Sequence, residues 1–255
     1  MLSRWKTLED SEIKQKVIVA IRRLLLQTNE RKKKVFAVGF NKSGTTSLHA
    51  LFKSLGLLSY HGAKWRGGDD LKLLRSYDCF SDGIPNDLAK LDNLFPGSRF
   101  ILQVRDLESW VYSRLAHIER KKEQNTHNGS PIWDNTEYAI KSWIKQRNAH
   151  HLFVLSYFSE RPSDILVFDF VRDESAATKV CNFLGYEGTY ERHKKQVNPG
   201  NRRPMKHIEM LSKCIAELEI PERELSYDIL CPSIISSDAH VRFSVDSSML
   251  EITKG

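Results

Sequence analysis

Apolar residues along the chain form two kinds of pattern. Short continuous runs typical of strands buried on both faces occupy residues 35–40, 57–60, 99–104 and 164–170. Apolar positions at three- and four-residue spacing predict helices at residues 48–55, 86–94, 107–117, 135–158, 175–184 and 205–219. Since strands and helices alternate, the chain is predicted to be an α/β protein, a three-layer fold with a central parallel sheet and helices on both faces.

The two ends of the chain do not share this alternation. Residues 1–33 are predicted to form an N-terminal amphipathic helix and a basic linker, with the α/β domain at 34–220 and an irregular extension at 221–255. The helix is expected to pack on the domain, and contact with a membrane surface is the alternative. Residues 119–133 are polar and rich in turn formers, so they are a candidate lid.

Composition narrows the class of protein. The 255 residues are 40% apolar, enough for a substantial core without disulfides or a structural metal. Four cysteines lie far apart with no CxxC pair, and are therefore expected to be reduced thiols. Because no apolar run is long enough for a membrane span and no signal peptide is evident, a cytoplasmic protein without a transmembrane anchor is expected.

The formal net charge of +7 favours an anionic ligand without naming it. Lysines and arginines are scattered apart from short runs such as 31–34 and 120–122, so no nucleic-acid partner is expected. A catalytically silent module that binds nucleic acid or acidic membrane nevertheless stays as an alternative.

The first predicted strand leads into the sequence GFNKSGTTS at residues 39–47. Glycines at the start of a helix let backbone N–H groups converge on an anion that the helix dipole also favours. In nucleoside triphosphatases the pattern is GxxxxGK[ST], whereas here Thr45 follows Gly44 and the lysine stands earlier, at Lys42. The segment is thus predicted to be a P-loop-like phosphate-binding turn without the usual phosphate lysine. A plain glycine turn is the alternative.

A second candidate anion site follows the strand at 99–104. Arg105 leaves the carboxyl end of that strand, where open α/β sheets bind ligands. The helix after it carries a set of residues on one face, namely Trp110, Ser113, Arg114 and His117. A guanidinium and the Ser113 hydroxyl aimed at one spot suit a phosphate. The alternative is an Arg–Asp pair that merely caps the helix.

Together these two motifs resemble a known family. Residues 41–47 resemble the PKSGT[ST] 5′-phosphosulfate loop of the sulfotransferases that use 3′-phosphoadenosine 5′-phosphosulfate (PAPS), and Arg105 with Ser113 resembles their 3′-phosphate motif. The similarity covers roughly residues 33–205, particularly with the bacterial and small-molecule branches. The chain departs from the family at Asn41, where many members have proline, and at Ser47, where cytosolic members have a tryptophan that stacks on adenine.

The resemblance implies transfer of a sulfuryl group from PAPS to a hydroxyl or amine, with the bisphosphate PAP as product and no metal. A small molecule or a sugar is the expected acceptor. The donor would be bound by Lys42, Ser43, Gly44, Thr45, Thr46, Ser47, Arg105 and Ser113, joined by Arg202 and Arg203 from a late basic loop. Lys42 would also be catalytic, because its charge can stabilise the leaving phosphate.

A proton acceptor for the attacking hydroxyl is the remaining requirement. Cytosolic members of the family use a histidine in a His-x-Pro segment, and the matching stretch here, residues 80–85, has Asp82 and no histidine. Asp82 is therefore predicted as the catalytic base, with His61 second and an unidentified group third. A turn-forming aspartate beside Gly83 is the structural alternative.

Two further interpretations depend on single residues. A P-loop kinase or NTPase would need a lysine after Gly44 and a strand-end aspartate for magnesium, for which Asp169 is the candidate. Trp65, Trp133 and Trp143 could wall an acceptor pocket, although core packing is the ordinary role of a tryptophan.

Overall fold

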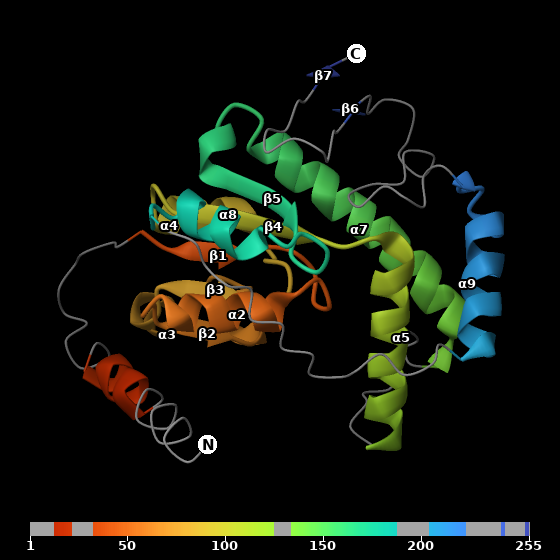
Figure 1. Ribbon diagram of the computed structural model, residues 1–255, viewed down its shortest axis with the longest axis horizontal. Coiled ribbons are helices and arrows are strands. Elements are labelled where there is room, and N and C mark those ends of the chain that lie inside the picture. The colour runs from red at the N-terminus through yellow and green to blue at the C-terminus, as the bar shows by residue number, and fades with distance from the viewer. Residues whose placement is uncertain are drawn as a thin grey trace.

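The computed structural model describes residues 13–21, 33–124, 134–187, 204–222, 241–242 and 253–254. In this part of the chain five parallel strands form one sheet in the order β2-β3-β1-β4-β5 (Figure 1). The strands are β1 Val35–Ala37, β2 Ser59–His61, β3 Cys79–Ser81, β4 Arg99–Val104 and β5 Ile165–Asp169. All ladders between them are parallel, so every carboxyl end lies at the same edge.

Helices connect the strands and cover both faces of the sheet. They are α2 Thr45–Ser54, α3 Leu71–Ser76, α4 Leu88–Leu94, α5 Leu107–Glu123, α7 Thr136–Tyr157, α8 Ala176–Phe183 and α9 Met205–Glu217. Short 3₁₀ turns lie at Ala63–Trp65 and Pro162–Asp164, and β6 Val241–Arg242 pairs with β7 Thr253–Lys254 in a separate antiparallel ribbon. The predicted α/β class with helices on both faces of a parallel sheet is thereby confirmed.

The core divides along the sheet because successive side chains of a strand point to opposite faces. On one face Phe36, Phe80 and Phe100 stand in register on β1, β3 and β4, with ring centroids 5.3 and 5.5 Å from the central Phe36. Helices α3, α4 and α7 contribute to this cluster. On the other face Ala37 and Ile101 pack against residues of α2 and α8.

A third apolar cluster extends beyond the sheet. Trp110, Val111, Trp143, Ile144 and Leu211 are among the buried residues that join α5, α7 and α9. Figure 1 shows these three helices on the right, with α5 running downward from the end of β4 past the sheet edge. The cluster therefore holds α5 beside the carboxyl ends of the strands.

Several sequence predictions need correction. Strand β3 and helix α3 were not predicted, because β3 has only two apolar residues in a row, Cys79 and Phe80, and the six residues of α3 are too few for a periodic pattern. The first strand ends at Ala37, since the chain turns into the loop at residue 39. The candidate lid is wrong at its start, where residues 119–123 continue α5, while residues 125–133 lie outside the described residues.

The N-terminal helix differs from expectation as well. Residues 13–21 are helical, but Ile13, Val17 and Ile21, which recur at four-residue spacing on its apolar face, are 59%, 51% and 48% exposed rather than packed on the domain. Among the described residues no helix is both long and apolar enough to cross a membrane. The division of the chain at residues 33 and 221 stays a prediction.

The cysteine prediction can be checked at three of four positions. Cys79, Cys181 and Cys214 are buried and free, and burial raises the pKa of each thiol. Cys231 lies outside the described part of the chain.

Candidate active site

The loop between β1 and α2 has the backbone of an anion cradle. Lys42 and Gly44 have positive φ angles of 70° and 94°, and Gly44 precedes α2 with no side chain capping the first turn. A β-carbon at residue 44 would lie 3.0 Å from Cβ of Phe170, so both conformation and space require glycine. The first amides of α2 thus have no side-chain cap, and the binding of an anion there stays a prediction.

The same loop is fixed to the sheet on its other side. The Gly39 N–H donates to Oε1 of buried Gln103 over 3.2 Å, and a β-carbon at residue 39 would overlap the Gln103 carbonyl oxygen. The Ser43 hydroxyl donates to the Phe40 carbonyl over 2.5 Å, while Thr45 is buried and Thr46 and Ser47 are half-buried. These hydrogen bonds tie the loop to β4 at Gln103 and close its turn between Phe40 and Ser43.

Arg105 lies directly against this loop. Its Nη1 donates to the Lys42 carbonyl oxygen over 2.8 Å, and its Nε donates to the Ser109 hydroxyl over 2.9 Å. The cap of α5 is made by Asp106, which accepts from the Ser109 N–H over 2.8 Å. Arg105 therefore contacts the loop and is not the residue that caps α5. Half-buried Ser113 lies one turn beyond Ser109 on the same helix. The two candidate anion sites adjoin.

Asn41, where many sulfotransferases have proline, connects the loop to α5. Its carbonyl accepts from Trp110 Nε1 over 3.0 Å, and its Oδ1 accepts from Arg114 Nη1 over 2.8 Å. The Arg114 guanidinium lies 5.0 Å from the Trp110 ring centroid and 4.3 Å from that of Trp143. Burial lowers the pKa of Arg114 to about 10. The helical spacing predicts Arg114 on the same face of α5 as Trp110, but the sequence carries no signal for its hydrogen bond to Asn41.

Positive groups gather where the Lys42 side chain meets α5. Burial lowers the Lys42 pKa, and Arg120, Arg114 and Lys121 lower it further, with Asp82 opposing them. Burial likewise lowers the pKa of His117 to about 4, with added repulsion from Lys42, Arg120, Lys121 and Arg114. His117 is consequently neutral at physiological pH, and it lies within electrostatic reach of Lys42, Arg120, Lys121 and Arg114.

Both predicted base residues lie near Lys42. Asp82 follows β3 with a φ of 88°, and its carbonyl accepts a hydrogen bond from the Arg66 guanidinium. His61 at the end of β2 has Nδ1 2.9 Å from the Ser81 hydroxyl. Burial lowers the His61 pKa, the charges of Lys42 and Arg66 lower it further, and the Asp82 carboxylate opposes this shift. The structure thus brings Lys42, His61 and Asp82 within electrostatic reach of one another.

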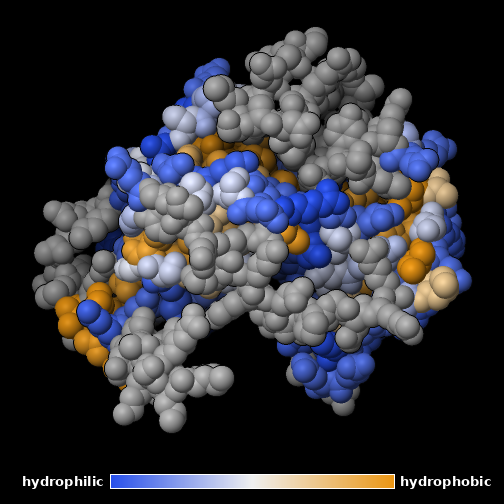
Figure 2. Space-filling view, in the orientation of Figure 1, coloured by the Kyte–Doolittle hydropathy of each residue, from blue (hydrophilic) through white to orange (hydrophobic). Residues whose placement is uncertain are grey.

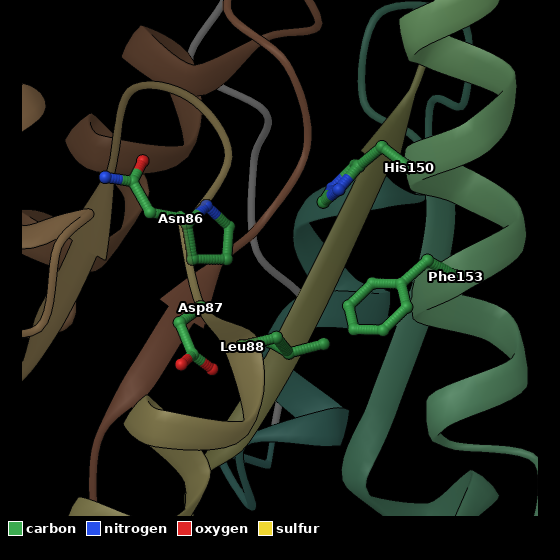
Figure 3. Close-up of a pocket in the computed structure, with 6 residues that line it drawn as sticks. Asn86, Asp87, Leu88, His150 and Phe153 are labelled. Atoms are coloured by element: carbon green, nitrogen blue, oxygen red, sulfur yellow. The ribbon is translucent and has the colours of Figure 1, made fainter.

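A pocket of about 330 Å³ opens beside the loop that Asp82 begins. Pro85, Asn86, Asp87 and Leu88 line one side, and His150 and Phe153 of α7 line the other (Figure 3). His150 Nε2 donates to the Val38 carbonyl over 2.7 Å, and burial lowers the pKa of this histidine to about 4. The Phe153 side chain is 51% exposed, so the pocket offers a neutral imidazole and an open aromatic face.

The carboxylate of Asp169, the candidate magnesium ligand, accepts backbone hydrogen bonds in the turn after β5. Its Oδ1 accepts from the N–H groups of Val171 and Arg172 over 2.8 and 3.1 Å. Burial raises the Asp169 pKa. Within the described residues no group of three or more His, Cys, Asp or Glu side chains is arranged to hold a metal ion.

Other predicted residues lie away from the site or outside the description. Trp65 is fully buried and Trp143 is 2% exposed, so both belong to the core rather than to a pocket wall. Trp133, Arg202 and Arg203 lie outside the described residues.

Comparison with known proteins finds similarity among solved structures alone. No family model and no curated protein matches the sequence. Among solved structures, the sulfotransferase from Alicyclobacillus acidocaldarius is similar, with 14% identity over 74% of this chain and 94% of that chain, at a TM-score of 0.43. A likeness of this size carries no argument, so any function has to be inferred from the side chains described above.

Proposed function

We propose that this protein is a sulfotransferase that moves a sulfuryl group from PAPS to a hydroxyl or amine of an acceptor. The observation that carries the proposal is the hydrogen bond from Arg105 to the Lys42 carbonyl. It joins an anion-binding loop after β1 to a guanidinium after the neighbouring strand β4. A donor with phosphates on both sides of one ribose needs two cationic sites at such short range.

The residues present fit this donor. The loop amides at positions 43–47, with the hydroxyls of Thr45 and Thr46, would hold the 5′-phosphosulfate at the uncapped start of α2. Arg105 and Ser113 would hold the 3′-phosphate, since a guanidinium fork matches phosphate oxygens. Arg202 and Arg203 are proposed to add to this second site.

Each reacting group has a candidate partner in the chain. The donor supplies an activated sulfuryl group whose sulfur–oxygen bond to the 5′-phosphate breaks as the acceptor oxygen bonds to sulfur. Lys42 would stabilise the negative charge that develops on the departing bridging oxygen. Asp82, or in second place His61, would accept the proton of the acceptor hydroxyl. The pocket beside residues 85–88 offers space for the body of a small molecule or a sugar.

Ligand-induced thermal stabilisation tests the proposal against the kinase alternative. PAP without magnesium is expected to raise the melting temperature, because both phosphates find cations in the chain itself. Stabilisation by ATP with magnesium, and none by PAP, would contradict it. Incubation with radiolabelled PAPS and a panel of phenols, alcohols, sugars and amines would then identify the acceptor class.

A further inference from the structure

The pocket beside residues 85–88 differs in chemical character from the edge of the sheet where the donor is proposed to bind. Figure 2 shows hydrophilic residues in the middle of the molecule, where β4 and β5 end. The six described residues that line the pocket include no lysine or arginine, and Pro85 and Leu88 are buried apolar side chains. The pocket therefore favours an uncharged and largely apolar occupant.

Two polar side chains of the lining point away from α7. Figure 3 shows this for the amide of Asn86 and the carboxylate of Asp87, whereas Leu88 points toward Phe153. The Asp87 carboxylate caps the start of α4. His150 and Phe153 stand three residues apart and project from the same side of α7. The imidazole of His150 is thus the polar group that α7 presents to the pocket.

This imidazole is fixed in one tautomer. Its Nε2 lies 2.7 Å from the Val38 carbonyl oxygen, which can only accept, so Nε2 carries the proton. Burial lowers the His150 pKa to about 4, and the ring is therefore neutral at physiological pH, with a lone pair on Nδ1. Because the two ring nitrogens point in different directions, this lone pair is directed away from Val38.

Nδ1 of His150 is open to a hydrogen-bond donor. It forms no hydrogen bond with any residue that the structure describes. Nor is it one of their fully buried polar atoms without a partner, which belong to Arg66, Arg114, Trp143 and Asp169. Solvent or a ligand therefore reaches this atom. In an otherwise apolar pocket, a hydroxyl or an N–H group of the occupant is its natural partner.

The same histidine contacts the loop that is proposed to bind the donor. Its ring packs edge-on against Phe40, with ring centroids 5.4 Å apart and an interplanar angle of 84°. Val38 and Phe40 stand on either side of Gly39 at the start of this loop. The pocket therefore adjoins the donor loop, and an acceptor bound in it would extend toward the sulfuryl group.

His150 lines the pocket, whereas the residues proposed for sulfuryl transfer do not. Neither Lys42 nor Asp82 is part of the lining, although Asp82 begins the loop that leads to it. In agreement, Lys42 and Asp82 both shift the pKa of His61, while no charged group contributes to the shift of His150. A group bound by His150 is therefore a different one from the hydroxyl that receives the sulfuryl group.

We infer that the acceptor combines a flat ring, which lies against Phe153, with a second hydroxyl or N–H group that is not sulfated and donates to Nδ1 of His150. This inference rests on the proposed sulfotransferase function and specifies its acceptor. His150 is thereby a positioning residue and not the proton acceptor. The pocket volume of about 330 Å³ lies near the lower end of the range for ligand pockets, which suits one small ring system.

The test uses compounds that differ only in the second donor. 4-(Hydroxymethyl)phenol is paired with 4-ethylphenol, and 4-hydroxybenzamide with 4-hydroxyacetophenone, so that the shape and the phenolic hydroxyl stay the same. Saturation-transfer NMR measures Kd for each compound with and without PAP, and transfer from labelled PAPS gives kcat/KM. We expect the wild-type protein to bind the compound with the second donor about tenfold more tightly in at least one pair.

Two variants of His150 separate the roles of its nitrogens. His150→Gln places an amide N–H near Nε2, where it can donate to Val38, and removes the acceptor at Nδ1. His150→Asn places an amide oxygen near Nδ1 and gives up the contact with Val38. The glutamine variant should lose the preference for the second donor, and the asparagine variant should keep it. If His150 only supports Val38, neither variant should change the preference.

The ring contact has its own variant and control. Phe153→Ala should weaken both members of a pair by a similar factor, about three- to tenfold, because stacking on the ring is lost. Tyr138→Ala is the matched control, since Tyr138 and Phe153 lie on the same helix with 53% and 51% exposure but only Phe153 lines the pocket. This control should bind all four compounds as the wild type does.

Equal binding within both pairs would overturn the inference, as would a preference that His150→Gln retains. If a His150 variant does not fold, the nitrogen-15 resonance of Nδ1 in the wild-type protein decides. It should move upfield with 4-(hydroxymethyl)phenol and stay in place with 4-ethylphenol, and equal responses would contradict the contact. Failure of PAP to bind would instead refute the proposed function, while the measurements without nucleotide would still decide whether His150 binds the second donor.

Discussion

The Nη1 atom of Arg105 lies 2.8 Å from the carbonyl oxygen of Lys42, so the residue after β4 supports the backbone of the loop after β1. Lys42 itself has a φ of 70°, a conformation that costs free energy for any residue except glycine. A strained lysine backbone held by a neighbouring guanidinium supports the binding role proposed for this loop.

Two substitutions of Lys42 distinguish the role of its ammonium group from the role of its backbone conformation. Lys42→Ala is expected to lower the rate of sulfuryl transfer by about two or more orders of magnitude, because one transition-state donor is lost. Lys42→Gly is the control, since glycine adopts the positive φ without strain. Both variants should fold and both should be slow. Recovery of the rate in the glycine variant would show that the backbone, and not the ammonium, limits turnover.

Arg105→Ala should chiefly weaken binding of the donor. The expected loss is about 2–4 kcal/mol in the affinity for PAP, since a guanidinium facing phosphate is removed. Ser113→Ala should cost less, about 1 kcal/mol for one hydroxyl. Calorimetry measures both, with Arg75→Ala, at an exposed position of α3, as the control. If the Arg105 variant bound PAP with unchanged affinity, Arg105 would only stabilise the loop and would not bind the donor.

The catalytic base can be assigned by a pair of conservative variants. Asp82→Asn keeps the shape and tolerates the φ of 88°, and it is expected to lower kcat by about a hundredfold or more. His61→Gln should lower it by less than about tenfold. If His61 were the base, the larger effect would fall on its variant. The wild-type rate would also decline below a pH set by the lowered His61 pKa, and that decline would be absent from the variant.

His150 should make stability depend on pH in a defined direction. Its pKa is about 4 in the folded protein and near 6.5 when unfolded, so between these values only the unfolded chain takes up the proton. Stability should therefore fall as the pH drops from 6.5 toward 4, by on the order of 2 kcal/mol at pH 4.5. His150→Gln should show a smaller decline in denaturant unfolding at pH 7 and 4.5. Equal declines in both proteins would contradict the assignment.

The fold was largely predictable because its strands are buried on both faces. Four of the five strands in the described sheet lie in longer apolar runs of the sequence, whereas β3 has only Cys79 and Phe80 as apolar residues, between Asp78 and Ser81, and carries no such signal. The loop at 39–47 could be predicted because the spacing of its glycines and lysine is typical of a P-loop-like turn between a strand and a helix. Positive φ at Lys42 could not, because lysine does not signal that conformation, whereas a turn-forming aspartate such as Asp82 is enriched in it.

The links between distant residues could not be predicted either. Asn41 holds Arg114 across 73 positions, and His150 holds the Val38 carbonyl across 112. Such contacts depend on how α5 and α7 pack against the sheet edge, and no local pattern encodes that packing. The sequence predicts chemistry at single positions, and the fold decides which of those positions lie close together.

Calorimetric titration with PAP, adenosine 5′-phosphate and adenosine 3′-phosphate in magnesium-free buffer tests the central claim most directly. If the loop at 42–47 and Arg105 bind opposite sides of one nucleotide, PAP should bind one site per chain at least about a hundredfold more tightly than either monophosphate. If PAP binds no better than the tighter monophosphate, the two cationic sites do not serve one donor, and the proposed sulfotransferase function fails.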